Sequence, residues 1–89
     1  MRLAARIDSN QREIVEALRK AGCSVQLLHT VGGGMPDMLC GRAGVNYLLE
    51  AKTDKGKLTI DQEMWHDAWK GAKPAIVRSV DEALRAVGL

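Results

Sequence analysis

A short apolar segment that ends in two opposite charges sets the first limit on the fold. Residues 47–52 form the sequence YLLEAK. On a β-strand, Glu50 and Lys52 point to the same face, about 6–7 Å apart along the chain, while Leu49 and Ala51 line the other face. A strand that is apolar on both faces is usually central and covered, so ionisable groups at its end need partners or a chemical task. The segment therefore predicts a central strand whose end is a candidate site.

Asp37 is the natural third member of this site, because it follows a proline at the start of another apolar run. The glycine-containing connection over residues 41–44 predicts that residues 37–40 fold back against residues 45–52 as a hairpin. Two carboxylates that converge from adjacent strands form an oxygen-rich site for Mg²⁺, completed by waters and a substrate phosphate. Lys52 beside them can hold the attacking water or neutralise charge on the phosphate. This pattern predicts metal-assisted hydrolysis of a phosphodiester.

Each half of the pattern is common on its own. A Glu-x-Lys pair at a strand edge is often a solvated surface pair, and Pro-Asp is a frequent turn dipeptide. The combination is more specific, because residues 32–34 form a glycine run just before Asp37 and a Thr-x-x-Gln helix start follows at Thr59. Together, at hairpin spacing, these features favour a hydrolytic site over a surface pair.

Length and composition indicate a single small globular domain over residues 1–89. The chain is 46% hydrophobic and 27% charged, and its net charge of +2 permits nucleic-acid binding without arguing for it. No apolar run approaches the ~20 residues that span a bilayer. Residues 1–6 are followed by polar residues instead of an apolar signal region. We therefore expect a cytoplasmic protein with no membrane contact.

Cys23 and Cys40 are too far apart in sequence for a zinc site and are predicted to be small core residues.

Hydrophobic periodicity and capping residues predict the order helix, three strands, helix, strand, helix. Asn10, Thr59 and Ser79 are the candidate N-caps. The predicted elements are a helix between Asn10 and Gly22, strands over Ser24–His29, 37–40 and 45–52, a helix over Ile60–Lys70, a strand over Ala75–Val77 and a helix from Ser79 to Val87. A final strand that is reached through a helical crossover implies an α/β fold, with a mixed sheet covered by helices.

Pro36-Asp37 followed by Glu50-Ala51-Lys52 resembles the PD-(D/E)xK nuclease motif. The wider pattern over residues 32–37, 46–52 and 58–62 is similar to the virus-type replication-repair nuclease (VRR-NUC) branch of that superfamily. The resemblance covers most of the chain, from the first predicted helix to the last strand. It implies a single small restriction-endonuclease-like domain, a mixed β-sheet flanked by helices in the order α-β-β-β-α-β-α, and a function like that of Holliday junction resolvases.

The resemblance also implies metal ligands and a catalytic cation. Asp37, Glu50 and the backbone carbonyl of Ala51 would hold Mg²⁺ or Mn²⁺, and Lys52 would orient the attacking water or stabilise developing charge. A glutamine at the place of Gln62 lies close to the metal site in the resembled family. Gln62 is also the third residue of a predicted helix, so a capping box explains it as well.

An additional acid near the start of the first helix often supports the metal site in this superfamily. By pattern the match falls on Glu13, although related resolvases would place it nearer Gln11. Glu13 is also correctly spaced to form a capping box with Asn10. The sequence leaves the choice between Glu13 and Gln11 open.

Two further segments are candidates for contact with the DNA backbone. Gly33 and Gly34 have no side chains, so their backbone can approach a phosphate closely, although a flexible connection would use the same residues. Lys55 and Lys57 lie in the polar loop that follows Lys52. A nuclease needs cations there to hold phosphates, although lysines on loops usually belong to a solvated surface.

The predicted helix over Ile60–Lys70 carries an apolar stripe that includes Trp65 and Trp69. Such a stripe is more typical of a core or an interface than of base stacking. Apolar surface beyond what one small core can cover would favour a homodimer. His66 lies on the more polar side of this helix and is given no role.

The resemblance thus implies a metal-dependent endonuclease that acts on branched or junction DNA, in a bacterial or phage DNA-repair setting. It would act as a homodimer, because two cuts need two sites. One alternative is a non-catalytic nucleic-acid-binding module on the same fold, in which the acid pair holds a structural ion or a salt bridge. Another is a structural subunit of a larger assembly, which rests only on the aromatic helix.

Overall fold

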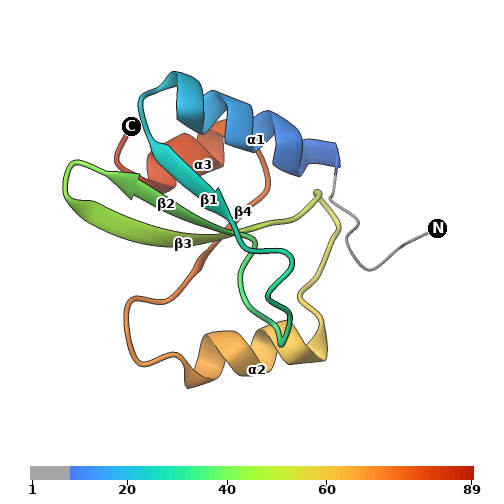
Figure 1. Ribbon diagram of the computed structural model, residues 1–89. Helices are drawn as coiled ribbons and strands as arrows, with labels where there is room; N and C mark the ends of the chain where they lie inside the picture. Colours follow the sequence, from blue (N-terminus) through green and yellow to red (C-terminus); the bar gives the residue numbers. More distant parts are fainter. Residues whose placement is uncertain (1–8) are drawn as a thin grey trace.

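A computed structural model describes residues 9–89 as a mixed sheet between two layers of helices (Figure 1). The elements are α1 (Ser9–Lys20), β1 (Ser24–Leu27), β2 (Met38–Arg42), β3 (Val45–Ala51), α2 (Ile60–Ala68), β4 (Ala75–Val77) and α3 (Val80–Ala86). The strand order is β1-β2-β3-β4, with β4 parallel to β3 and the other pairs antiparallel. Helices α1 and α3 lie on one side of the sheet and α2 on the other. The predicted fold class and element order are confirmed.

The β2–β3 hairpin forms as predicted, but its connection is shorter, because Gly41 and Arg42 belong to β2. Its register pairs Met38 with Leu49, and its turn residues Ala43 and Gly44 have φ of 51° and 81°. Positive φ at both central residues is typical of a type I′ turn, which matches the right-handed twist of the two strands. One residue before the Met38–Leu49 pair, this register brings Asp37 level with Glu50.

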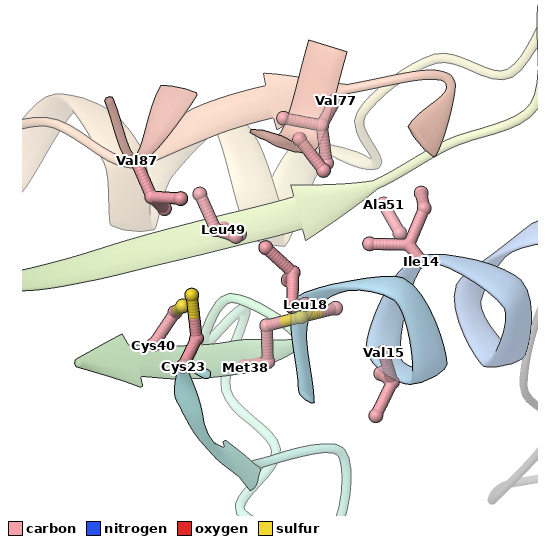
Figure 2. Close-up of a cluster of buried hydrophobic side chains, with 11 residues drawn as sticks. Ile14, Val15, Leu18, Cys23, Met38, Cys40, Leu49, Ala51, Val77 and Val87 are labelled. Atoms are coloured by element: carbon pink, nitrogen blue, oxygen red, sulfur yellow. The ribbon is translucent and has the colours of Figure 1, made fainter. Parts of the chain in front are cut away.

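The core lies between the sheet and the α1 and α3 helices. Figure 2 shows Leu18 of α1 beside Met38 and Leu49, and Ile14 beside Ala51. The buried apolar residues are Ile14, Val15, Leu18, Cys23, Met38, Cys40, Leu49, Ala51, Val77, Ala83 and Val87. Leu49 and Ala51 belong to this core, so the face that carries Glu50 and Lys52 is turned toward α2, as the period of two requires.

Both cysteines are buried and free, which confirms the prediction that they are core residues. Burial raises the pKa of the Cys40 thiol to about 11, and the nearby thiol of Cys23 adds to the shift. Cys40 is therefore a neutral thiol at pH 7 and acts as a small apolar group.

Replacing Leu49 with alanine is expected to lower the free energy of unfolding by about 2–5 kcal/mol, because the side chain is fully buried and its loss leaves a cavity. Urea denaturation followed by circular dichroism measures the change. Val45→Ala, on the exposed end of the same strand, is the control and should change the free energy by less than about 1 kcal/mol. Equal losses in the two variants would contradict the assignment of Leu49 to the core.

Several predicted element ends are wrong. Helix α1 includes Asn10, whose Nδ2 donates to the carbonyl of Lys52 at 2.7 Å, so Asn10 is not an N-cap. Strand β1 ends at Leu27, before His29, because residues 28–31 form a turn and the glycines after it have positive φ. Helix α2 ends at Ala68, since Trp69 adopts an extended conformation. The N-caps predicted at Thr59 and Ser79 are confirmed.

Candidate active site at the end of the β2–β3 hairpin

The carboxylate of Asp37 lies against the end of β3. Its Oδ2 accepts a hydrogen bond from the backbone N–H of Ala51 at 2.7 Å. The backbone carbonyl of Asp37 accepts from the N–H of Leu28 at 2.8 Å, which continues the pairing with β1 by one residue. Because Ala51 lies between Glu50 and Lys52, the structure brings Asp37 directly beside that pair.

Glu50 is fully buried, and side chains of α2 contact both of its carboxylate oxygens. Gln62 Nε2 donates to Oε2 at 3.2 Å, and His66 Nε2 lies 3.4 Å from Oε1. Gln62 also forms the predicted capping box with Thr59: Oε1 of Gln62 accepts from the Thr59 N–H at 2.9 Å, and the Gln62 N–H donates to Oγ1 of Thr59 at 3.2 Å. One side-chain amide therefore caps the start of α2 and also contacts the Glu50 carboxylate.

His66 is a buried residue of this site, and its placement on a polar, unengaged side of the helix is wrong. Burial lowers the pKa of His66 below its usual value of 6.5. Asp67 opposes this shift, while the ammonium groups of Lys73 and Lys52 add to it. The imidazole is therefore neutral at pH 7. A neutral imidazole has one N–H and one acceptor nitrogen, so the tautomer with the proton on Nε2 can donate to Glu50.

Lys52 is held at the site through its backbone. Its N–H donates to the carbonyl of Val77 on β4 at 3.0 Å, and its own carbonyl accepts from Asn10. The half-buried side chain leaves β3 on the same face as Glu50. The effect of its charge on the pKa of His66 is consistent with an ammonium group on the α2 side of the sheet.

The donor set fits a small divalent cation. Asp37 and Glu50 supply carboxylates, and the Ala51 carbonyl faces the same edge of β3 as its N–H, which contacts Asp37. Within residues 9–89, no group of three or more His, Cys, Asp and Glu side chains could form an all-protein cage for a metal. Mg²⁺ is commonly held by one or two carboxylates together with waters and substrate phosphates, and Mn²⁺ accepts the same oxygen ligands.

Comparison with known proteins identifies the family. The family model described as archaeal Holliday junction resolvase (Hjc) matches residues 4–68, which include α1, the hairpin and α2. The chain belongs to this family. The Hjc family lies in the PD-(D/E)xK nuclease superfamily, and membership implies a nuclease that binds junction DNA. No curated protein and no solved structure matches the chain. Across residues 9–89, no helix is both long and apolar enough to cross a membrane.

In this Hjc family member, Gln11 and Glu13 lie on different faces of α1. Gln11 is only 3% exposed and shares the buried face with Ile14 and Leu18, whereas Glu13 is exposed. The Nε2 of Gln11 is buried and has no hydrogen-bond partner, which is uncommon for a buried amide. Of the two residues that the sequence left open, Gln11 is therefore the one on the sheet side of the helix.

The loop that carries Lys55 and Lys57 is fixed by a residue that sequence analysis missed. Nη1 of Arg78 donates to the carbonyls of Thr53 at 2.6 Å, Gly56 at 2.7 Å and Asp54 at 3.3 Å. Lys55 and Lys57 remain exposed on this loop. No local pattern could have identified Arg78, because it lies more than twenty residues further along the chain.

The glycine run makes a close backbone contact, but with α2. A Cβ on Gly34 would clash with the backbone carbonyl of Asp61 in the first turn of that helix, and Gly34 has a φ of 85°. Gly33 is exposed, and a Cβ on it would meet nothing. Gly34 therefore helps to place α2, and with it Gln62, against the hairpin.

The apolar stripe of α2 is not a core. Trp65 and Trp69 stack with ring centroids 4.6 Å apart, yet Trp69 is 43% exposed and Met64 is 64% exposed. The sequence predicted either a core or an interface for this stripe. The structure leaves it as an exposed surface that is available to an interface.

Proposed function

We propose that this Hjc family member is a metal-dependent endonuclease that hydrolyses phosphodiester bonds in branched or four-way junction DNA. The observation that carries the proposal is the hydrogen bond from the Ala51 N–H to Asp37, which sets one carboxylate beside Glu50 and Lys52. Family membership indicates that the substrate is a nucleic acid. The resemblance to the VRR-NUC branch remains a prediction from the sequence.

Each residue has a distinct task in the proposed reaction. Asp37, Glu50 and the carbonyl of Ala51 hold Mg²⁺ or Mn²⁺. When bound, such a cation supplies Lewis-acid chemistry at the phosphate and activates water. Lys52 positions the attacking water or stabilises the charge that develops on the phosphate oxygens, and Gln62 holds the Glu50 carboxylate in place.

The proposed path for the DNA backbone runs beside the site. Lys55 and Lys57 would contact phosphates from the loop that Arg78 fixes, and the exposed backbone at Gly33 allows close approach of the DNA backbone. Contacts of this kind position the DNA without selecting a base sequence, which suits an enzyme that recognises a branched shape.

A homodimer is the proposed working form. Resolution of a four-way junction needs two cuts, and one chain carries one set of Asp37, Glu50 and Lys52. The exposed side chains of Ile60, Met64 and Trp69 on α2 supply apolar surface that a second copy could cover. Light scattering of the free protein and of the junction complex tests the dimer.

The test of the function is cleavage of a labelled four-way junction and of a linear duplex of the same sequence. With Mg²⁺ or Mn²⁺ we expect paired cuts near the branch point of the junction, little cutting of the duplex, and none with EDTA. Junction binding without cleavage across a series of divalent metals would overturn the enzyme and support the alternative of a non-catalytic binding module.

Replacing Arg78 with methionine is expected to raise the dissociation constant for junction DNA by about threefold to tenfold. Without the guanidinium, the loop that carries Lys55 and Lys57 must be ordered when DNA binds. The entropic cost of ordering is about 0.5–1.5 kcal/mol for each side chain that becomes fixed. Fluorescence anisotropy in Ca²⁺ measures the affinity. Arg85→Met, an exposed arginine on α3, is the control, and equal affinities of the Arg78 variant and wild type would contradict this role.

A further inference from the structure

Two side chains that are one helical turn apart on α2 contact the same carboxylate. Gln62 and His66 are separated by four residues and so project from the same face of the helix. Gln62 reaches Oε2 of Glu50 and His66 reaches Oε1, at 3.2 and 3.4 Å. The proposed reaction gives no task to His66, although it is the more deeply buried of the two.

Contacts to both oxygens restrict the plane of the carboxylate. The last torsion of a glutamate side chain has a broad energy profile, so a contact to one oxygen restricts the plane of the carboxylate less than contacts to both oxygens. Donors from Gln62 and His66, one for each oxygen, limit this rotation. A carboxylate has about four acceptor positions, so it can accept two hydrogen bonds and also coordinate a cation.

The helix that carries His66 is contacted at both of its ends. Nζ of Lys73 donates to the carbonyls of His66 at 2.8 Å, Asp67 at 3.0 Å and Trp69 at 2.9 Å, at the end of α2. At the other end, Gly34 lies against the first turn. Figure 1 shows α2 alone on its side of the sheet. The contact at Gly34 places its first turn against the segment that leads into β2, and the contacts of Lys73 hold its last turn.

We propose that His66 is a positioning residue for the metal-binding carboxylate: its Nε2–H holds Oε1 of Glu50 while Gln62 holds Oε2, which fixes the orientation in which Glu50 meets a divalent cation. The inference deepens the proposed function and rests on it, because Glu50 is a metal ligand only in that function. A group that orients a metal ligand in this way typically changes metal affinity or activity by 10–100-fold when it is removed.

Calcium binding tests the inference without any cleavage. Isothermal titration calorimetry of the DNA-bound protein with Ca²⁺ compares wild type with His66→Ala, His66→Gln and Ala68→Gly. We expect roughly 10–100-fold weaker binding for His66→Ala. His66→Gln should recover most of the affinity, because its amide nitrogen occupies about the place of Nε2. Ala68→Gly, an exposed position that loosens the last turn of α2 without touching Glu50, should bind Ca²⁺ like wild type.

Two further measurements separate positioning from general packing. In cleavage assays, the Mg²⁺ concentration for half-maximal rate should rise in His66→Ala by the same factor as the Ca²⁺ dissociation constant, while kcat at saturating Mg²⁺ changes by less. In the metal-free wild type, ¹⁵N spectra of the imidazole should show a neutral ring protonated at Nε2. A ring protonated at Nδ1 would overturn the proposal.

The possible results distinguish this inference from the proposed function. If Ca²⁺ binding depends on His66 and Gln restores it, but no metal supports cleavage, then the positioning role stands and the nuclease does not. If His66→Ala binds Ca²⁺ as wild type does, or if Ala68→Gly loses as much affinity, the positioning role is overturned whatever the cleavage assay shows. A wild-type protein that binds no divalent cation would overturn both.

Discussion

Replacing Asp37 with asparagine is expected to lower kcat/KM for junction cleavage by on the order of 10³-fold. Loss of a group that only supports a metal ligand typically costs 10–100-fold, so loss of a ligand's charge should cost more. The fold should survive, because the asparagine carbonyl can still accept the hydrogen bond from the Ala51 N–H. Cleavage rates are measured alongside Ca²⁺ titration, which should show weaker metal binding.

The matched control for this variant is Asp81→Asn. Asp81 is exposed in the first turn of α3, on the opposite side of the sheet from α2. Cleavage and metal binding should be the same in Asp81→Asn as in wild type. Wild-type cleavage in Asp37→Asn, with the same metal requirement, would remove Asp37 from the proposed site.

Replacing Lys52 with methionine is expected to lower kcat by about 10²–10³-fold, a range typical for removal of one group that stabilises transition-state charge. Methionine keeps an unbranched, flexible side chain of similar reach and removes the ammonium. The backbone contacts that hold residue 52 to Val77 and Asn10 do not depend on the side chain. Single-turnover cleavage at saturating Mg²⁺ is the measurement.

Ca²⁺ affinity distinguishes the two variants. Lys52→Met should bind Ca²⁺ at least as well as wild type, because the proposed role of the lysine concerns the water or the phosphate and a cation has been removed from beside the metal. Lys20→Met, at the exposed end of α1, serves as the control. Loss of metal binding together with loss of cleavage in Lys52→Met would instead indicate a role in holding the site together.

The hairpin and the residues at its end could be predicted because they depend on neighbours in the sequence. The period of two separates Glu50 and Lys52 from Leu49 and Ala51, and the glycine-containing connection predicts a hairpin that brings Asp37 to the same end of the sheet. The exact register comes from the structure, in which the turn has two residues. The capping box of Thr59 and Gln62 is equally local. Each of these features follows from backbone geometry over a few residues.

Other features were missed because they depend on how distant segments meet. Asparagine is a residue type that favours the N-cap position, yet in the structure the side-chain amide of Asn10 contacts the carbonyl of Lys52 from inside the helix. His66 has polar neighbours on α2, but its spacing of four from Gln62 could have placed it on the face that contacts Glu50. Arg78 gave no local signal at all.

The sequence by itself determined the order of the elements, the presence of the hairpin and the three charged residues at its end, because turn chemistry and side-chain alternation act within short segments. Only the tertiary structure decided which face of α1 meets the sheet, which residues of α2 hold Glu50, and which arginine fixes the lysine loop. Those choices depend on the rotation and docking of helices, which are set by packing between segments far apart in the chain.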